Sequence, residues 1–278
     1  MVKPILILVC MLSIAALLPS AYGQTTPQPG SPEADELANK AFLAANELMK
    51  QQKPVEALVK YKEAFVLRPD SPAIPFNAGL AAYLSGNYVD ALDMWKKLKA
   101  LDSVDWQARA KLVQAYQALG RTVDRDTERS ELFELRKSGK SPELSQQAKY
   151  CREQFEANGL KVMAFEHFEL KGDRALRYVF SVMNDTGKGE AYRISLGSYE
   201  DTNAVWRETT KPTPKKGERL FHLDSYSPGM HATYGMFSHE PSYEETRAMV
   251  VKILEGKSKA LSSTTYGSAA PPQEKPKP

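Results

Sequence analysis

The residues 57–67, ALVKYKEAFVL, and 91–101, ALDMWKKLKAL, decide the fold of this chain, because the second stretch repeats the first 34 positions later. Alanine begins both stretches, and an aromatic residue follows four positions on, as Tyr61 and Trp95. A small residue lets two helices approach closely, and an aromatic side chain fills the space beside it. A repeat of this length with small residues at set places predicts stacked pairs of antiparallel helices.

Two full copies of this unit span residues 38–71 and 72–105, and a third begins at Trp106. Their small, aromatic and proline positions resemble the tetratricopeptide repeat (TPR) family over residues 35–138. The first copy places Ala45, Ala57, Tyr61, Ala64 and Pro69 at these positions, and the second places Gly79, Ala91, Trp95, Leu98 and Ser103 there. The resemblance implies a helical docking domain, which we predict for residues 35–148.

The third copy departs from the pattern. Leu112 and Tyr116 remain in register, but Arg125 and Arg129 stand where the small residue and the aromatic residue belong. Arrays of this kind need a polar outer face at their ends. We therefore predict that residues 122–138 form a charged capping helix.

The resemblance also implies a concave groove lined by the first helix of each pair. The partner-binding residues predicted from it are Phe42, Asn46, Met49, Phe76, Asn77, Leu80, Tyr83, Lys111 and Gln114. An apolar floor with amide edges suits an extended peptide or a helix. The alternative is that these aromatic side chains pack against the C-terminal half of the chain or against a neighbouring helix.

One variant of the family holds a C-terminal carboxylate with lysines, asparagines and an arginine. Asn46, Asn77 and Lys111 match three of its positions, but Phe42 and Gln107 stand where lysines are needed. The sequence therefore disfavours capture of a free C-terminus.

The N-terminus has the pattern of an export signal. Lys3 provides a positive start, an apolar run covers residues 5–18, and small residues flank Tyr22. We predict a signal peptide over residues 1–23, followed by a flexible linker over 24–34, and a periplasmic or secreted protein with no stable membrane span after cleavage. The alternative is a membrane anchor, although the run is short for a span.

From about residue 150 the apolar pattern changes from a helical period to alternation, which is typical of strands. Leu176, Tyr178, Phe180 and Val182 alternate in one such run. Short turn signals separate the runs and leave no room for crossover helices. The pattern therefore predicts an antiparallel meander of about six or seven strands.

A helix follows this meander in the sequence pattern. Residues 241–254 have the apolar spacing of a helix that packs on one face of the sheet. The chain is therefore expected to have an α+β fold, with its second domain over residues 149–257. The Ser-, Pro- and Lys-rich stretch 258–278 is predicted to be a disordered tail.

Candidate chemistry in this half centres on its histidines. A hairpin turn at Pro228-Gly229 would place His231 opposite Tyr226, Thr233 opposite Asp224, and Gly235 opposite His222. His222, Asp224, His231 and His239 would then share one face, as zinc ligands could. We favour a solvated polar face instead, and predict no metal, no cofactor and no catalytic residue.

The charge balance gives no sign of nucleic-acid binding, since the formal net charge is only +3. Together these patterns favour an exported, non-enzymatic interaction scaffold of a bacterial cell envelope. It would dock a protein or peptide in the helical groove, while the ligand of the sheet half and the oligomeric state stay open. The alternative is a secreted enzyme, possibly a hydrolase, with its site in the sheet half.

Overall fold

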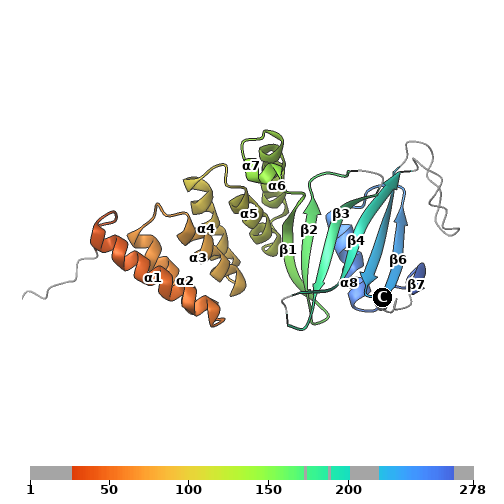
Figure 1. Ribbon diagram of the computed structural model, residues 1–278, viewed down its shortest axis with the longest axis horizontal. Coiled ribbons are helices and arrows are strands. Elements are labelled where there is room, and N and C mark those ends of the chain that lie inside the picture. Colours follow the sequence, from red (N-terminus) through yellow and green to blue (C-terminus); the bar gives the residue numbers. More distant parts are fainter. Residues whose placement is uncertain (1–26, 172–173, 187–188, 201–218, 266–278) are drawn as a thin grey trace, which may run out of the picture.

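The computed structural model describes residues 27–171, 174–186, 189–200 and 219–265. The predicted signal peptide lies outside these ranges, so its cleavage stays a prediction. Within the described residues, no helix has both the length and the apolar character that crossing a membrane requires. Helix pairs follow one another at one end of the molecule, and a sheet continues the row at the other end (Figure 1).

Seven described helices precede the sheet. They are α1 (Pro32–Lys50), α2 (Pro54–Leu67), α3 (Ala73–Leu84), α4 (Tyr88–Leu101), α5 (Trp106–Ala118), α6 (Thr122–Lys137) and α7 (Pro142–Ser145). α1 begins inside the predicted linker 24–34, because the Ser31 side chain caps it and Pro32 occupies its first position. Side-chain caps from Asn87 and Asp105 likewise begin α4 and α5.

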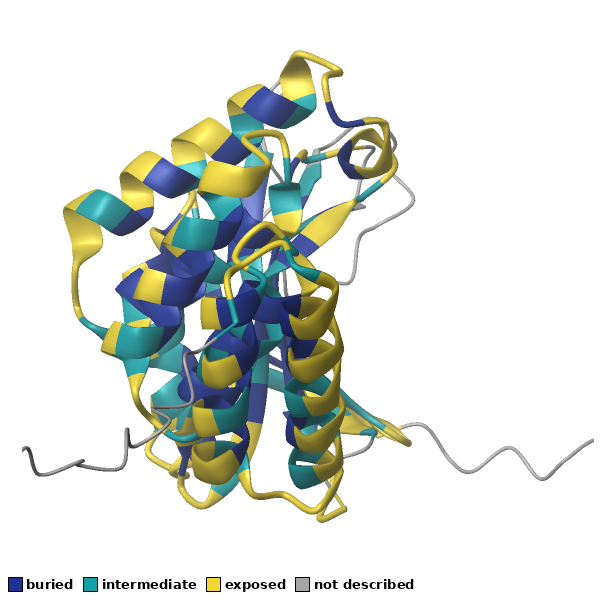
Figure 2. Cartoon of the chain, turned by 90° about the vertical axis from the view of Figure 1, so that its left-hand side faces the viewer, coloured by how far each residue is buried: buried dark blue, intermediate teal, exposed yellow. Residues whose placement is uncertain are grey.

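The two repeated stretches form α2 and α4, and their small residues lie inside the array. Ala57, Ala91 and Trp95 are fully buried. A Cβ atom at Gly79 would overlap the indole of Trp95, so glycine is needed for this ring to fit. The Trp95 indole N–H donates to the carbonyl oxygen of Phe76 over 3.2 Å and so links α4 to α3. The predicted repeat of paired helices is confirmed, and Figure 2 shows buried residues gathered between these helices.

The described strands form one antiparallel sheet in chain order. They are β1 (Lys149–Ala157), β2 (Leu160–His167), β3 (Arg174–Met183), β4 (Glu190–Glu200), β5 (Arg219–Ser227), β6 (Met230–Phe237) and β7 (Ser262–Thr265). The turn between β1 and β2 is Asn158-Gly159, where both residues adopt positive φ as a tight hairpin requires. The predicted meander is therefore confirmed.

Helix α8 (Tyr243–Leu254) packs on one face of this sheet and confirms the α+β fold. Ser242 and Glu245 form a capping box at its start. The core between helix and sheet is made by Val162, Phe180, Ile194, Leu196, Leu223, Tyr243, Val250 and Leu254, together with partly buried neighbours. Figure 1 shows α8 crossing one side of the strands.

The predicted disordered tail over residues 258–278 is wrong for Ser262–Thr265, which forms β7. This strand pairs with β6, with Ser263 opposite Ala232, and the Leu261 amide donates to the Thr233 carbonyl oxygen over 2.7 Å. Backbone groups along the edge of a sheet can pair with a polar segment, because the ladder needs no apolar side chains. Composition therefore did not indicate this strand.

Candidate functional site

Six of the nine predicted partner-binding residues are half-buried side chains of α1 and α3. Among them Phe42, Met49 and Phe76 rest against the buried core of the array. The Phe42 ring lies 5.6 Å from the ring of Tyr61. Each of these side chains keeps part of its apolar surface in contact with water, and covering that surface would be favourable. Their role in partner binding stays a prediction.

The two asparagines of the predicted groove already have partners within the chain. The Tyr61 hydroxyl donates to Asn46 Oδ1 over 2.6 Å. Asn77 Nδ2 donates to the carbonyl oxygen of Ala73, in the same helix, over 2.8 Å. Both amides therefore support the helices, and a ligand would have to share or replace these bonds.

Tyr83 lies where the array meets the sheet. It is buried, with its ring 5.1 Å from that of Tyr88 and 5.8 Å from that of Trp95. Burial raises the pKa of its hydroxyl, and the nearby Glu153 and Cys151 of β1 raise it further. The prediction that Tyr83 faces an open groove is therefore wrong, because its side chain packs in the core of the array against α4 and lies close to β1.

The groove closes at the third repeat, because β1 packs along α5. Gln114 is buried and its Nε2 donates to the carbonyl oxygen of Cys151 over 2.8 Å. Ala110 belongs to an apolar cluster with Tyr150 and Phe168 of the sheet half. The prediction that Gln114 faces an open groove is wrong, and at this repeat the alternative of packing on the C-terminal half is correct.

Lys111 is the remaining predicted groove residue, and it lies beside the closing strand. Its half-buried ammonium group is 5.8 Å from the Trp95 ring and 3.4 Å from Gln114 Oε1. Burial lowers the pKa of Lys111, while the nearby Cys151 thiol acts in the opposite direction. No carboxylate of the described residues forms an ion pair with it.

Helix α6 carries three arginines that bind the sheet half. Arg125 pairs with Glu244 at the start of α8, and Arg129 pairs with Glu166 of β2. Arg136 pairs with Glu169, just beyond β2. These three pairs form the junction between the helical half and the sheet half. Arg125 is only 4% exposed. The helix predicted over residues 122–138 is confirmed, but its interpretation as a solvent-facing cap is wrong. Its charged side is an interface with the sheet.

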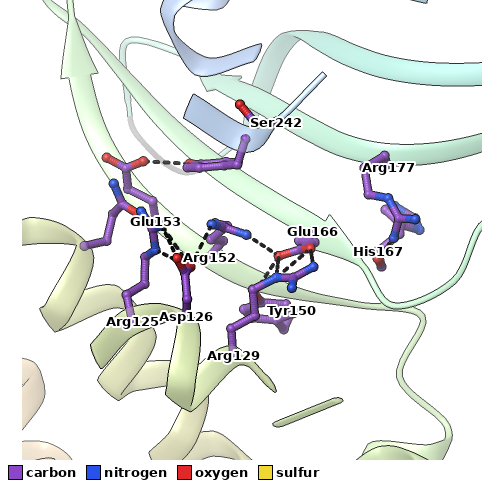
Figure 3. Close-up of polar contacts among 12 residues, drawn as sticks. Arg125, Asp126, Arg129, Tyr150, Arg152, Glu153, Glu166, His167, Arg177 and Ser242 are labelled. Carbon is purple, nitrogen blue, oxygen red and sulfur yellow. Dashed lines mark hydrogen bonds and ion pairs between the residues drawn. The ribbon is translucent and has the colours of Figure 1, made fainter. Parts of the chain in front are cut away.

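Glu166 is the centre of this interface and is fully buried. Arg129, Arg152 and Tyr150 all point toward it (Figure 3). Arg152 Nη1 and the Tyr150 hydroxyl donate to Glu166 Oε2 over 2.6 and 2.7 Å. Burial alone would raise the pKa of Glu166, but the bonds and charges of the two arginines outweigh it and hold the pKa below its ordinary value.

A second buried carboxylate, Glu153, lies on the same side of β1. The Tyr243 hydroxyl donates to its Oε2 over 2.6 Å, and Arg247 Nε donates to both of its oxygens over 3.0 Å. The Arg152 guanidinium stacks on the Tyr243 ring at 4.0 Å. These contacts join β1 to α8 within the sheet half, whereas the pairs of Arg125 with Glu244 and of Arg129 with Glu166 join that half to α6.

Sequence reasoning did not identify this cluster as an interface. The signal was present in Arg125 and Arg129, which break the repeat at two positions where the first two copies keep small and aromatic side chains. Their partners could not be identified, because Glu166 and Glu244 are distant in sequence and no spacing rule connects them.

The histidines of β5 and β6, His222 and His231, were predicted to lie in one particular strand pairing, and the observed pairing differs from it by one residue at His222. Tyr226 faces His231 and Asp224 faces Thr233, as predicted. His222 faces Met236 instead of Gly235, because a bulge between Leu223 and Asp224 shifts the pairing by one residue.

The prediction of a solvated face is wrong for this group. Asp224 is fully buried, and its Oδ2 contacts His222 Nδ1. The Tyr226 hydroxyl donates to the same oxygen over 3.1 Å, and its ring stacks on His231 at 4.6 Å. His239 lies beyond the end of β6 and is exposed. Among the described residues, no group of three histidine, cysteine or acidic side chains has the geometry to hold a metal ion.

An open hollow of about 440 Å³ lies where α6 and the segment after α7 meet β2 and β3. It is lined by Arg136, Ser145, Gln146, Gln147, Ala148, His167, Glu169, Lys171, Ala175 and Leu176. The ion pairs of Glu169 with Arg136 and Lys171 belong to this lining. Of these two pairs, that of Arg136 with Glu169 joins α6 to the sheet half, so the charged groups of the hollow already pair with one another.

Comparisons with known proteins describe the helical half alone. No family model matches the chain, and no curated protein matches it. The first TPR domain of Spaghetti (RPAP3), bound to an HSP90 peptide, is 20% identical and covers 40% of this chain and 93% of its own, with a TM-score of 0.34.

Two further TPR domains are similar to the same extent. That of OM64 from Arabidopsis is 18% identical over 37% of this chain and 84% of its own, with a TM-score of 0.34. That of Sgt2 from Aspergillus fumigatus is 20% identical over 43% and 78%, also at 0.34. The neighbours of the helical half are TPR domains, as the sequence resemblance implied, and these similarities describe the fold alone.

Proposed function

We propose that this chain is a non-enzymatic interaction protein that binds a polypeptide segment along the groove of α1 and α3. The observation that supports it is the row of half-buried apolar side chains on these helices, Phe42, Met49, Phe76 and Leu80. Large anchors of this kind usually dominate the energy of an interface. The HSP90 peptide was bound to the RPAP3 domain, and the support for binding by this chain is its own groove.

We further propose that the protein acts in a bacterial cell envelope, as a periplasmic or secreted scaffold. Lys3, the apolar run over residues 5–18 and the small residues Ala21 and Gly23 support export. N-terminal sequencing of the mature protein is expected to begin near Gln24. An intact Met1 in the membrane fraction would contradict export and favour an anchor.

A secreted enzyme remains the second candidate, and the contact of His222 with buried Asp224 is the observation that favours it. A carboxylate that orients a histidine is a common part of acid–base catalysis. A hydrolytic activity of the purified protein that disappears in His222→Ala would establish this candidate over a pure scaffold.

The groove is tested by replacing one anchor. Phe76→Ala should weaken capture of a partner from an envelope extract by roughly 2 kcal/mol, because a well-buried aromatic anchor contributes about this much. The melting temperature should change little, since Phe76 is not one of the buried spacers between helices. Capture is measured by quantitative pull-down, and melting by circular dichroism.

The matched control is Phe65→Ala, on α2. Phe65 is also a half-buried phenylalanine, but it belongs to the second helix of its pair, where the Lys97 ammonium lies 5.2 Å from its ring. Capture should be unchanged in this variant. A Phe76→Ala protein that melts several degrees lower and captures normally would show that Phe76 is a core residue, and the groove proposal would fail.

A further inference from the structure

Strand β1 closes the groove at α5, and one face of β1 extends beyond this contact. Gln114 Nε2 donates to the Cys151 carbonyl oxygen over 2.8 Å, and buried Tyr83 lies close enough to β1 that Glu153 and Cys151 add to the raised pKa of its hydroxyl. Cys151 also lies close enough to Lys111 for each to affect the pKa of the other. The groove surface at Lys111 therefore passes directly onto β1.

The register of β1 and β2 shows which side chains follow. Cys151 lies opposite Phe165, and Gln154 lies opposite Met163. A bulge at Arg152 separates these two pairs and turns Arg152 and Glu153 to the other side, toward α8. Antiparallel partners share a face of the sheet. The face on the groove side therefore carries half-buried Phe165 and Met163 beside exposed Gln154.

Lys149 belongs to the same face, at the start of β1. It lies opposite His167, and its ammonium group is 4.5 Å from the centre of the Phe165 ring. Like Lys111, it has no ion pair with a carboxylate of the described residues. The Phe165 ring thus lies beside Lys149, and neither Lys149 nor Lys111 is paired with a carboxylate of the described chain.

The α8 side of the same junction has the opposite character. There Arg125, Arg129 and Arg152 are each paired with carboxylates of the chain. Partial burial of a cation costs hydration, and Lys111 is met only by neutral groups among its described contacts, Gln114 Oε1 at 3.4 Å and the Trp95 ring at 5.8 Å. The half-buried ammonium of Lys111 therefore favours a negative group supplied from outside, and exposed Lys149 adds to the same potential.

We propose that the partner surface extends from the groove of α1 and α3 across β1 onto β2, and that it binds an extended polypeptide segment with acidic side chains beside apolar ones. The acidic side chains pair with Lys111 and Lys149, and an apolar side chain covers Phe165 and Met163. This inference rests on the proposed function, since it names the continuation of the same surface and the chemistry of its partner.

The test is a selection of random linear peptides, displayed on phage, on the full chain. The enriched peptides should be rich in aspartate and glutamate next to apolar residues. The strongest of them is then synthesised, and its affinity is measured by fluorescence anisotropy. Each of Lys111→Gln and Lys149→Gln should weaken binding about three- to fivefold, as loss of a partly exposed ion pair does.

Lys252→Gln is the matched control, because this exposed lysine of α8 lies on the other side of the sheet and has no ion pair with a described carboxylate. It should leave the affinity unchanged. Phe165→Ala should weaken binding as the two lysine variants do, while raised salt reduces the affinity of the wild type more than that of Lys149→Gln.

Two results would overturn this inference. One is a selection without acidic enrichment, and the other is an acidic peptide whose affinity is unaffected by Lys149→Gln and Phe165→Ala. If binding then still depends on Phe76, the groove proposal stands and only its extension onto the sheet fails. If binding depends on neither, both fail.

Discussion

The second and third repeats show how two residues decide what a helix packs against. In the second repeat, Ala91 and Trp95 of α4 are fully buried against the neighbouring helices. In the third, Arg125 and Arg129 occupy the corresponding positions of α6 and reach carboxylates of the sheet half. Small and aromatic side chains thus continue the array, whereas paired charges at the same positions end it and attach a different domain.

The strongest way to break this comparison is to remove the charge of Glu166. Glu166→Gln should destabilise the protein by about 3–5 kcal/mol, because it leaves buried Arg152 with only the more distant carboxylate of Asp126, at 4.0 Å. Urea unfolding followed by circular dichroism measures this change. Glu169→Gln is the control, since Glu169 is 41% exposed and its loss should cost within about 1 kcal/mol.

A result in which both variants unfold alike would mean that the junction does not depend on its buried ion pair. Such a result would contradict the view that ion pairs fix the third repeat to the sheet half, whereas apolar packing fixes the second repeat in the array.

The apolar side of the comparison is tested with Ala91→Leu. The added side chain has no space between α4 and its neighbours, so we expect a loss of about 1–3 kcal/mol from overpacking. Ala100→Leu in the same helix is the control, because Ala100 is exposed and should tolerate leucine. Thermal melting of both variants checks the prediction, and equal melting temperatures would contradict the proposed packing.

We expect the smallest change in the free energy of unfolding when the pH is lowered. The pKa of Glu166 is lowered in the folded protein, so the stability this carboxylate provides is complete above the ordinary glutamate pKa of about 4.3 and is lost as the pH falls through its folded value. Unfolding free energies measured between neutral and acidic pH should therefore decline at the acid end. In Glu166→Gln this part of the decline should be absent, and an identical pH profile in the variant would show that other carboxylates account for it.

The group of His222, Asp224 and His231 shows why some features of the candidate sites could not be predicted from the sequence. The hairpin at Gly229 and the facing of Tyr226 with His231 follow from turn chemistry and alternation. The bulge at Leu223 and the complete burial of Asp224 do not, because they depend on how neighbouring strands cover this part of the sheet. A pattern of alternating polar residues cannot tell a solvated face from a covered one.

The same limit applies to the groove. Repeat spacing placed Phe42 and Phe76 together on the first helices of their pairs, where the structure shows them half-buried. It could not show that β1 covers Gln114, since Cys151 is 37 residues away and belongs to a different kind of element. Nor could composition reveal β7, whose pairing depends on the free edge of β6.

The sequence by itself determined the helix pairs and the meander, because periodicity and turn residues act over a few positions and leave a local record. Only the tertiary structure decided how the two halves join, through Arg129 and Glu166, and where the groove ends against β1. These contacts join segments far apart in the chain. Their stability depends on mutual burial and pairing of charge, which no single stretch of sequence contains.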